Sequence, residues 1–329
     1  MTKFLHSRAM LVLASLLALG CALACVGLAG YPPALQSFGL AKAWSGEWVV
    51  PQPASMWIAV GLNIGIAAML AYVNKAFNLL RCLTMLQGTV FLFMQMASSR
   101  LLVEVNPGLA LCFAWIVCML LLFPNFSASM PQKEVFLAFA IMSGMSACVD
   151  EALILIPGLW LACGQMRIFN IRTVLASLMG LACPWIIFFG FCLIGPDGIQ
   201  PPSLLKFGDA LSGIDSLFLA LLAFTVFLGA VCWVQNFMKY LTYTAKYRAY
   251  QGFVTVSMLL CVLGIACDVA DSLAILPVLN VCVALQVAHL FGVIHFTRKS
   301  WIPILIILLI YLFLSYPFVL AWQMIAYVL

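Results

Sequence analysis

The chain has 329 residues, of which 66% are hydrophobic and only 8% are charged, and its mean hydropathy is +1.17. Soluble domains carry about 25% charged residues, so this composition excludes a soluble protein. No segment shows the alternation of a membrane β-strand. The sequence therefore predicts an all-α, polytopic transmembrane helix bundle that forms one integral-membrane domain over residues 1–329. The net charge of +5 is spread among loops, so no nucleic-acid partner is expected.

Apolar runs long enough to cross a bilayer recur along the chain. A spanning helix needs about 20 apolar residues. Such runs lie near residues 9–30, 54–73, 82–99, 106–124, 173–194, 215–237, 251–268, 273–293 and 301–321. The first run follows Lys3 and Arg8 and is too long for the core of a signal peptide, so we interpret it as an uncleaved span.

The stretch 134–166 is apolar but too long for one helix, and Asp150 and Glu151 stand side by side at its centre. Each half has about 15 residues, or roughly 22 Å of helix, against a hydrocarbon core of about 30 Å. The stretch therefore predicts either two short spans or a re-entrant hairpin. With this broken pair, the chain is expected to have about 11 membrane segments.

The basic residues orient this arrangement. If the N-terminus is cytoplasmic and 134–166 returns to its starting side, the outer side holds only Lys42, Arg100 and Lys206. The cytoplasmic side then holds the other lysines and arginines: Lys3, Arg8, Lys75, Arg81, Lys133, Arg167, Arg172, Lys239, Lys246, Arg248, Arg298 and Lys299. Such a bias is the positive-inside pattern. It predicts that Asp150 and Glu151 face outward, in an acidic cavity.

Several ionisable residues of the outer side are candidates for function. Paired carboxylates can serve as a general base or a cation site, so Asp150, Glu151 and Glu47 are the catalytic candidates. The substrate-binding candidates are Arg100, Glu104, Asp268 and Asp271. An arginine can bind a phosphate through two parallel hydrogen bonds. The structural alternatives are that Arg100 and Glu104 pair with each other on a helix, and that the aspartates are ordinary turn residues.

No cofactor and no metal are expected. The chain has no nucleotide-binding or zinc-protease motif, and His289 and His295 are six residues apart, which takes them off one helix face. The 13 cysteines lie almost entirely inside apolar runs, where free cysteine behaves as a small hydrophobic residue. The basic, tyrosine-rich stretch 239–250 is typical of an anchor for anionic lipids.

Three stretches carry a resemblance: LAYVNKAFNLLRCLTMLQGTVFLFMQ (70–95), IFNIRTVLASLMGLACPWIIFFGF (168–191) and VLNVCVALQVAHLFGVIHFTRKS (278–300). They resemble a family of bacterial multi-span inner-membrane proteins known only as a domain of unknown function. The matching residues are Asn74, Asn78, Arg81, Arg172, Thr173, Gly180, Pro184 and His289. The resemblance implies a location in the bacterial inner membrane, no established activity, and structural roles for these residues.

Three functions remain open. The first is a membrane subunit or scaffold in cell-envelope biogenesis, with membrane lipids and other envelope proteins as partners. The second is an enzyme like the glycosyltransferases that use polyprenyl-phosphate sugars, with Glu47 or the Asp150 and Glu151 pair as base and Arg100 as phosphate partner. The third is an ion-coupled transporter of small solutes, which the broken segment 134–166 favours.

Overall fold

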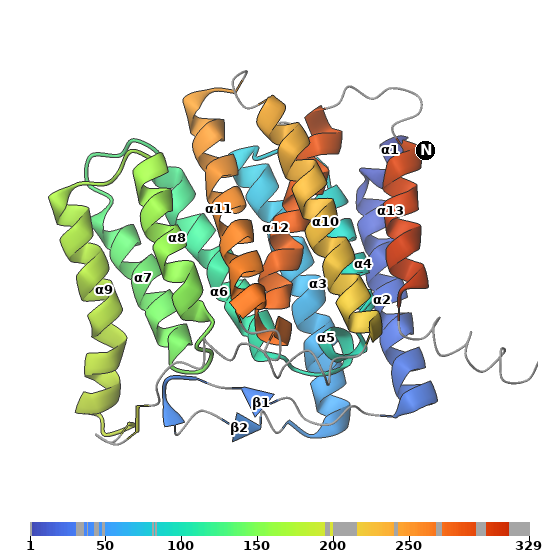
Figure 1. Ribbon diagram of the computed structural model, residues 1–329, viewed down its shortest axis with the longest axis horizontal. Coiled ribbons are helices and arrows are strands. Elements are labelled where there is room, and N and C mark those ends of the chain that lie inside the picture. Colours follow the sequence, from blue (N-terminus) through green and yellow to red (C-terminus); the bar gives the residue numbers. More distant parts are fainter. Residues whose placement is uncertain are drawn as a thin grey trace, which may run out of the picture.

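The computed structural model describes residues 2–30, 36–37, 39–42, 46–47, 50–80, 82, 84–194, 198–199, 216–239, 243–267, 272–293 and 301–315. Arg81, Asp268 and Asp271 lie outside the described residues. The predicted helical bundle is confirmed, and Figure 1 shows its long helices running roughly parallel to one another. The helices are α1 (Thr2–Leu5), α2 (Arg8–Ala29), α3 (Gln52–Phe77), α4 (Leu86–Met96), α5 (Ser99–Val103), α6 (Pro107–Leu122), η2 (Phe123–Asn125, a 3-10 helix), α7 (Gln132–Ser146), α8 (Ala152–Gln165), α9 (Ile171–Gly190), α10 (Ser216–Met238), α11 (Ala245–Cys267), α12 (Ser272–Val293) and α13 (Trp301–Phe313).

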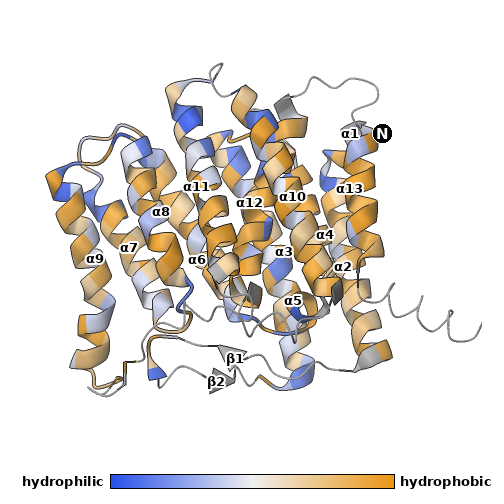
Figure 2. Ribbon diagram, in the orientation of Figure 1, coloured by the Kyte–Doolittle hydropathy of each residue, from blue (hydrophilic) through white to orange (hydrophobic). Residues whose placement is uncertain are grey.

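Seven of the described helices are long and apolar enough to cross a membrane, namely α2, α3, α6, α9, α10, α11 and α12. Each lies where the hydropathy pattern placed a span, and α8 and α13 are shorter apolar helices. Most residues of these helices are apolar, although the upper end of α11 and the lower end of α3 are hydrophilic (Figure 2). Many large hydrophobic side chains are exposed, for example Ile171, Met179 and Phe227, as expected where the solvent is lipid.

The bundle has two distinct ends. One end, at the top of Figure 1, carries α1, η2 and the turn between α8 and α9, and we call it the upper end. The other carries a small antiparallel hairpin of β1 (Gln36–Ser37) and β2 (Gly46–Glu47), helix α5 and the turn between α7 and α8. We call it the lower end.

One predicted span is wrong in length. The run 82–99 was expected to form a full crossing, yet α4 has only 11 residues, about 16 Å of helix. The described residues before it, 78–80, 82, 84 and 85, are not helical, because Asn74 holds them in a loop. Its Nδ2 donates to the carbonyls of Cys82 (3.0 Å) and Thr84 (3.3 Å), and its Oδ1 accepts from the Leu80 amide (2.9 Å).

The predicted break in 134–166 is confirmed. Helix α7 ends at Ser146 and α8 begins at Ala152, so the chain reverses at Asp150 and Glu151 instead of running on as one helix. The hairpin is extended by α9, which packs closely on α7. A Cβ added at Gly180 would lie 2.5 Å from the Phe136 carbonyl oxygen, and Ser143 Oγ donates to the Leu181 carbonyl at 2.6 Å. Small residues at this contact let two backbones approach, as is common between membrane helices.

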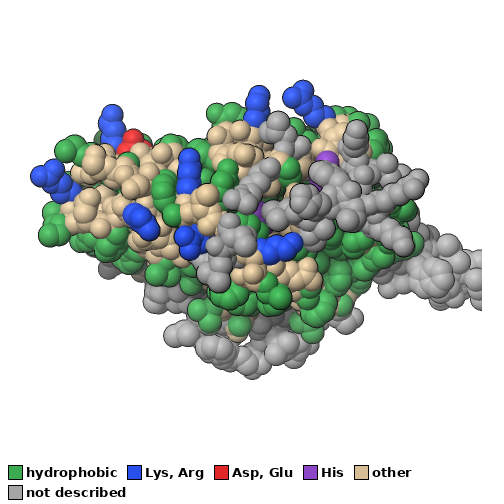
Figure 3. Space-filling view, turned by 90° about the horizontal axis from the view of Figure 1, so that it is seen from above, with side chains coloured by type: hydrophobic (Ala, Val, Ile, Leu, Met, Phe, Trp, Pro, Cys, Tyr) green, Lys and Arg blue, Asp and Glu red, His purple; other side chains and the backbone are tan. Residues whose placement is uncertain are grey.

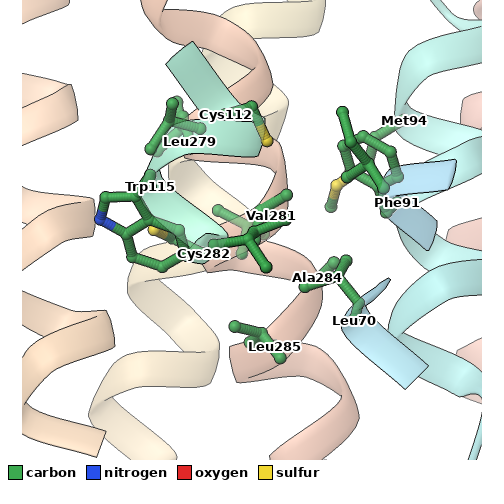
Figure 4. Close-up of a cluster of buried hydrophobic side chains, with 14 of the residues drawn as sticks. Leu70, Phe91, Met94, Cys112, Trp115, Leu279, Val281, Cys282, Ala284 and Leu285 are labelled. Carbon is green, nitrogen blue, oxygen red and sulfur yellow. The ribbon is translucent and has the colours of Figure 1, made fainter. Parts of the chain in front are cut away.

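Helix α12 is the centre of the bundle. It packs against α4, α6, α10 and α11, and 94% of its most apolar window is buried. In Figure 4 its side chains point toward Cys112 and Trp115 of α6 on one side and toward Leu70, Phe91 and Met94 of α3 and α4 on the other. A helix surrounded by protein on all sides has no need of a polar face. The polar residues that α12 does carry are therefore informative.

Candidate functional site

The acidic turn that the sequence singled out is tightly enclosed. Asp150 is 3% exposed and Glu151 is 7% exposed. The loop after β1 lies on this turn: the amides of Leu40 and Ala41 donate to the carbonyls of Ser146 (3.0 Å) and Ala147 (3.1 Å). Gly39 has no room for a Cβ, because the Ala147 carbonyl oxygen occupies that space. The lower end thus covers the turn with protein.

The two acids stand at the start of a helix. Glu151 is the N-cap residue of α8, where its side chain makes no capping hydrogen bond, and the backbone carbonyls of Asp150 and Glu151 accept from the amides of Leu153 (2.9 Å) and Ile154 (3.1 Å). Negative charge at a helix N-terminus is stabilised by the helix dipole. The turn therefore places two carboxylates where α8 favours them, which offsets part of their burial.

Three of the other candidates, Glu47, Arg100 and Glu104, belong to elements of the lower end. Glu47 lies in β2, paired with Gln36 of β1. Arg100 is exposed in α5, whereas Glu104, which caps α5, is only 6% exposed. The contacts of Asp268 and Asp271 lie outside the described residues.

A second set of polar residues lies at the centre of the bundle, and sequence reasoning missed it. Three polar side chains of α12 bond to neighbouring segments, two of them to helices and one to Tyr243 just before α11. Asn280 Nδ2 donates to Gln95 Oε1 of α4 at 3.5 Å, and Gln286 Nε2 donates to Thr255 Oγ1 of α11 at 3.1 Å. His289 Nε2 lies 3.1 Å from the Tyr243 hydroxyl. Polar side chains that bond across helices hold a membrane bundle in register.

Beside Gln286 the helices leave a cavity of about 180 Å³. Helices α10 and α11 are consecutive, but α10 packs on α12, α11 packs on both α8 and α12, and the two make little contact with each other. The cavity lies where they diverge, towards the upper end. Its lining comes from α8, α10, α11, α12 and the segment before α11: Gln165, Trp233, Asn236, Phe237, Tyr243, Gln251, Gly252, Thr255, Val256 and Gln286.

The lining is polar but uncharged. Four carboxamides face one small space, from Gln165, Asn236, Gln251 and Gln286, together with the hydroxyls of Thr255 and Tyr243. Each carboxamide offers both donors and an acceptor. Neither a carboxylate nor a basic side chain is among the described lining residues. This chemistry suits the binding of a neutral, hydrogen-bonding group better than acid–base catalysis, which needs a group that exchanges protons.

The signal for this cavity was present in the sequence. Asn236 and Gln286 each interrupt an apolar run, and polar residues inside membrane helices tend to face the bundle interior. Gln165 and Gln251 stand at the ends of apolar runs, and none of the four carries a charge. Their spacing along the chain also carries no motif, because they come from four different helices.

The residues that carry the family resemblance have structural positions where the structure describes them. Asn78 ends α3 in the left-handed conformation, with φ of 49°. Thr173 forms a reciprocal cap with Asn170 at the start of α9, and Gly180 is the close contact between α9 and α7. His289 is bonded to Tyr243. Pro184 lies inside α9, and Arg172 is exposed at the start of that helix.

Within the described part of the chain, no three His, Cys, Asp or Glu side chains gather as a metal site would require. The cysteines described are free thiols, and most are buried: Cys21, Cys25, Cys112, Cys118, Cys163, Cys232, Cys261 and Cys282.

The fold defines a class, an all-helical bundle with several helices apolar enough for a multi-pass membrane protein. Comparison with known proteins adds no closer identity: no family model, no curated protein and no solved structure matches the chain. The resemblance to a bacterial inner-membrane family stays a prediction.

Proposed function

We propose that the chain is a multi-pass protein of the bacterial inner membrane with its upper end in the cytoplasm. The support is the distribution of charge between the two ends. The basic side chains described at the upper end are Arg8, Lys75, Lys133, Arg167, Arg172, Lys239, Lys246 and Arg248, and Figure 3 shows Lys and Arg gathered on this face. The charged residues described at the lower end are Lys42, Arg100, Glu47, Glu104, Asp150 and Glu151. Positive charge stays on the cytoplasmic side during insertion.

In this proposal the chain has 11 membrane segments, which are α2, α3, α4 and α6 to α13. The short helices α7 and α8 have 15 and 14 residues, so they form a hairpin that reaches the outer interface at its turn. The short helix α4 lies inside the bundle, where all its residues are buried.

We further propose that the protein is a non-catalytic membrane subunit or scaffold in envelope biogenesis, one that binds a lipid-type partner. The observation that carries this is the cavity between α8, α10, α11 and α12, with its carboxamide lining. The enzyme alternative needs a carboxylate at the substrate, but Asp150 and Glu151 belong to the opposite end and are absent from the lining. The transporter alternative rests on the broken pair α7 and α8, whose turn is buried under Leu40 and Ala41.

Cysteine labelling tests the orientation. Lys42 and Lys246 are exposed at opposite ends, so each can be replaced by cysteine in a Cys192→Ser background that removes an exposed native thiol. A membrane-impermeant maleimide added to intact spheroplasts is expected to label Lys42→Cys and to label Lys246→Cys only after lysis. Labelling of Lys246→Cys from outside would overturn the proposed orientation.

A further inference from the structure

The cavity between α8, α10, α11 and α12 contains a buried side-chain amide that has no hydrogen-bond partner among the described residues. Gln251 is 6% exposed and lines the cavity, yet it forms no hydrogen bond with any described residue. The neighbouring amides are partly bonded: Asn236 donates to Gln286 Oε1 at 2.7 Å and Gln286 donates to Thr255, while the buried Asn236 Oδ1 has no hydrogen-bond partner among the described residues. The Gln251 carboxamide and the Asn236 Oδ1 are therefore available to a ligand in this cavity.

The walls of the cavity indicate an amphipathic ligand. On the α10 side stand the rings of Trp233 and Phe237, whose centroids lie 6.2 Å apart, and Phe237 is 62% exposed. On the α8 side the Gln165 amide lies directly over Gly252, where a Cβ would overlap it. Aromatic surface next to the carboxamides can hold an apolar stem while the amides hold a polar head.

The depth of the cavity places this head near one membrane surface. Asn236 is two residues from the end of α10, and Gln251 is in the second turn of α11. Gln286 is seven residues, about 10 Å, from the end of α12. In the proposed membrane placement, on which this inference rests, that is the headgroup region of the cytoplasmic leaflet.

The lining also constrains the charge of the head. A charged group would lose its hydration here without an opposite charge among the described lining residues to compensate it. Hydroxyl groups both donate and accept, as carboxamides do, so a ring of hydroxyls can satisfy several amides at once. A volume of about 180 Å³ is comparable with a single sugar ring.

We propose that this cavity binds the neutral, hydroxyl-rich headgroup of a membrane lipid, a sugar-bearing or glycerol-bearing lipid of the leaflet at the upper end, with Gln251 as its principal hydrogen-bonding residue. The gap between α10 and α11 is the route by which the lipid enters sideways. Trp233 and Phe237 contact the first carbons of its apolar part.

The test uses the whole protein in nanodiscs of phosphatidylcholine, with monoglucosyl diacylglycerol added in steps up to about a tenth of the lipid. Thermal unfolding of the wild type is expected to rise by at least about 3 °C and to saturate. Gln251→Leu is expected to fold normally, since this side chain bonds to no described residue, but to lose the shift. Gln132→Leu, at the start of α7 and outside the cavity, should keep it.

Parallel discs with diacylglycerol or phosphatidylglycerol separate the possible sources of a shift. Equal shifts in the wild type and in Gln251→Leu would overturn the assigned site. A shift with anionic phosphatidylglycerol but none with the glucolipid would overturn the neutral headgroup, and no shift with any lipid would overturn the proposal. Because nanodiscs expose both faces, these outcomes are independent of the orientation that cysteine labelling tests.

Discussion

Asn236 of α10 donates to the side-chain oxygen of Gln286 on α12 at 2.7 Å and to its backbone oxygen at 3.1 Å. Asn236→Leu leaves the buried Gln286 Oε1 without this donor, so we expect a loss of about 1–2 kcal/mol in the free energy of unfolding. The double variant Asn236→Leu with Gln286→Leu should cost less than the sum of the two single changes. Unfolding in detergent followed by circular dichroism measures all three. Gln235→Leu, an exposed neighbour on α10, is the control and should change little.

The loop between α3 and α4 depends on a single side chain. Asn74 makes three hydrogen bonds to it, so Asn74→Ala should destabilise the protein by about 3 kcal/mol. Asn125→Ala is the matched control, because Asn125 donates to Leu121 within its own helical turn. Burial also raises the pKa of Cys82 in this loop, which lowers the fraction of reactive thiolate. Maleimide labelling located by mass spectrometry should therefore find Cys82 more reactive in Asn74→Ala than in the wild type. Unchanged reactivity would mean that the Asn74 hydrogen bonds do not hold this loop.

The contact between α7 and α9 tolerates no added methyl group. Gly180→Ala places a Cβ 2.5 Å from the Phe136 carbonyl oxygen, and backbone cannot yield as a flexible side chain would. We expect a loss of about 1–3 kcal/mol, measured by thermal unfolding. Gly190→Ala in the same helix meets nothing within 4 Å and should be neutral or slightly stabilising. A neutral Gly180→Ala would mean that the two helices are farther apart than described.

The acidic turn can be tested as a cap. If Asp150 and Glu151 serve the N-terminus of α8, Asp150→Asn with Glu151→Gln should lower the free energy of unfolding by about 1 kcal/mol. Insertion, topology and the response to glucolipid should remain as in the wild type. A variant that keeps its full stability but no longer supports growth would instead identify the pair as a functional site.

The sequence was a good guide to the helices, because a membrane span is determined by residues that are neighbours in the sequence. Their positions follow from runs of apolar residues, and the reversal at Asp150 follows from two adjacent charges that a helix crossing lipid would not hold at mid-depth. It was a poor guide to α4, because the residue that keeps the segment before α4 from being helical, Asn74, lies in the preceding helix. A hydropathy pattern contains no information about hydrogen bonds between separate segments of the chain.

The same contrast between local sequence patterns and tertiary contacts explains what could be predicted of the candidate site. Charges are conspicuous in an apolar chain, so the sequence directed attention to Glu47, Arg100 and the acidic turn. Carboxamides are not conspicuous, and the ones around the cavity approach each other only when α8, α10, α11 and α12 assemble. A search for glutamine and asparagine inside apolar runs would have named Asn236 and Gln286, but not their pairing.

His6 in the N-terminal segment is expected to make the stability of the folded protein depend on pH. His6 Nδ1 lies 2.6 Å from Thr84 Oγ1, which ties the start of the chain to the loop before α4, and burial lowers the pKa of His6 below its ordinary value of 6.5. Between that lowered pKa and 6.5, His6 binds a proton in the unfolded chain but not in the folded one. The folded state is therefore destabilised relative to the unfolded state as the pH falls below 6.5, and His6 causes no such loss above pH 6.5. The melting temperature should thus drop between pH 7.5 and pH 5.5. In His6→Gln, which keeps a hydrogen-bonding side chain but does not titrate, the drop should be smaller. An equal drop in both proteins would assign the pH dependence to other groups.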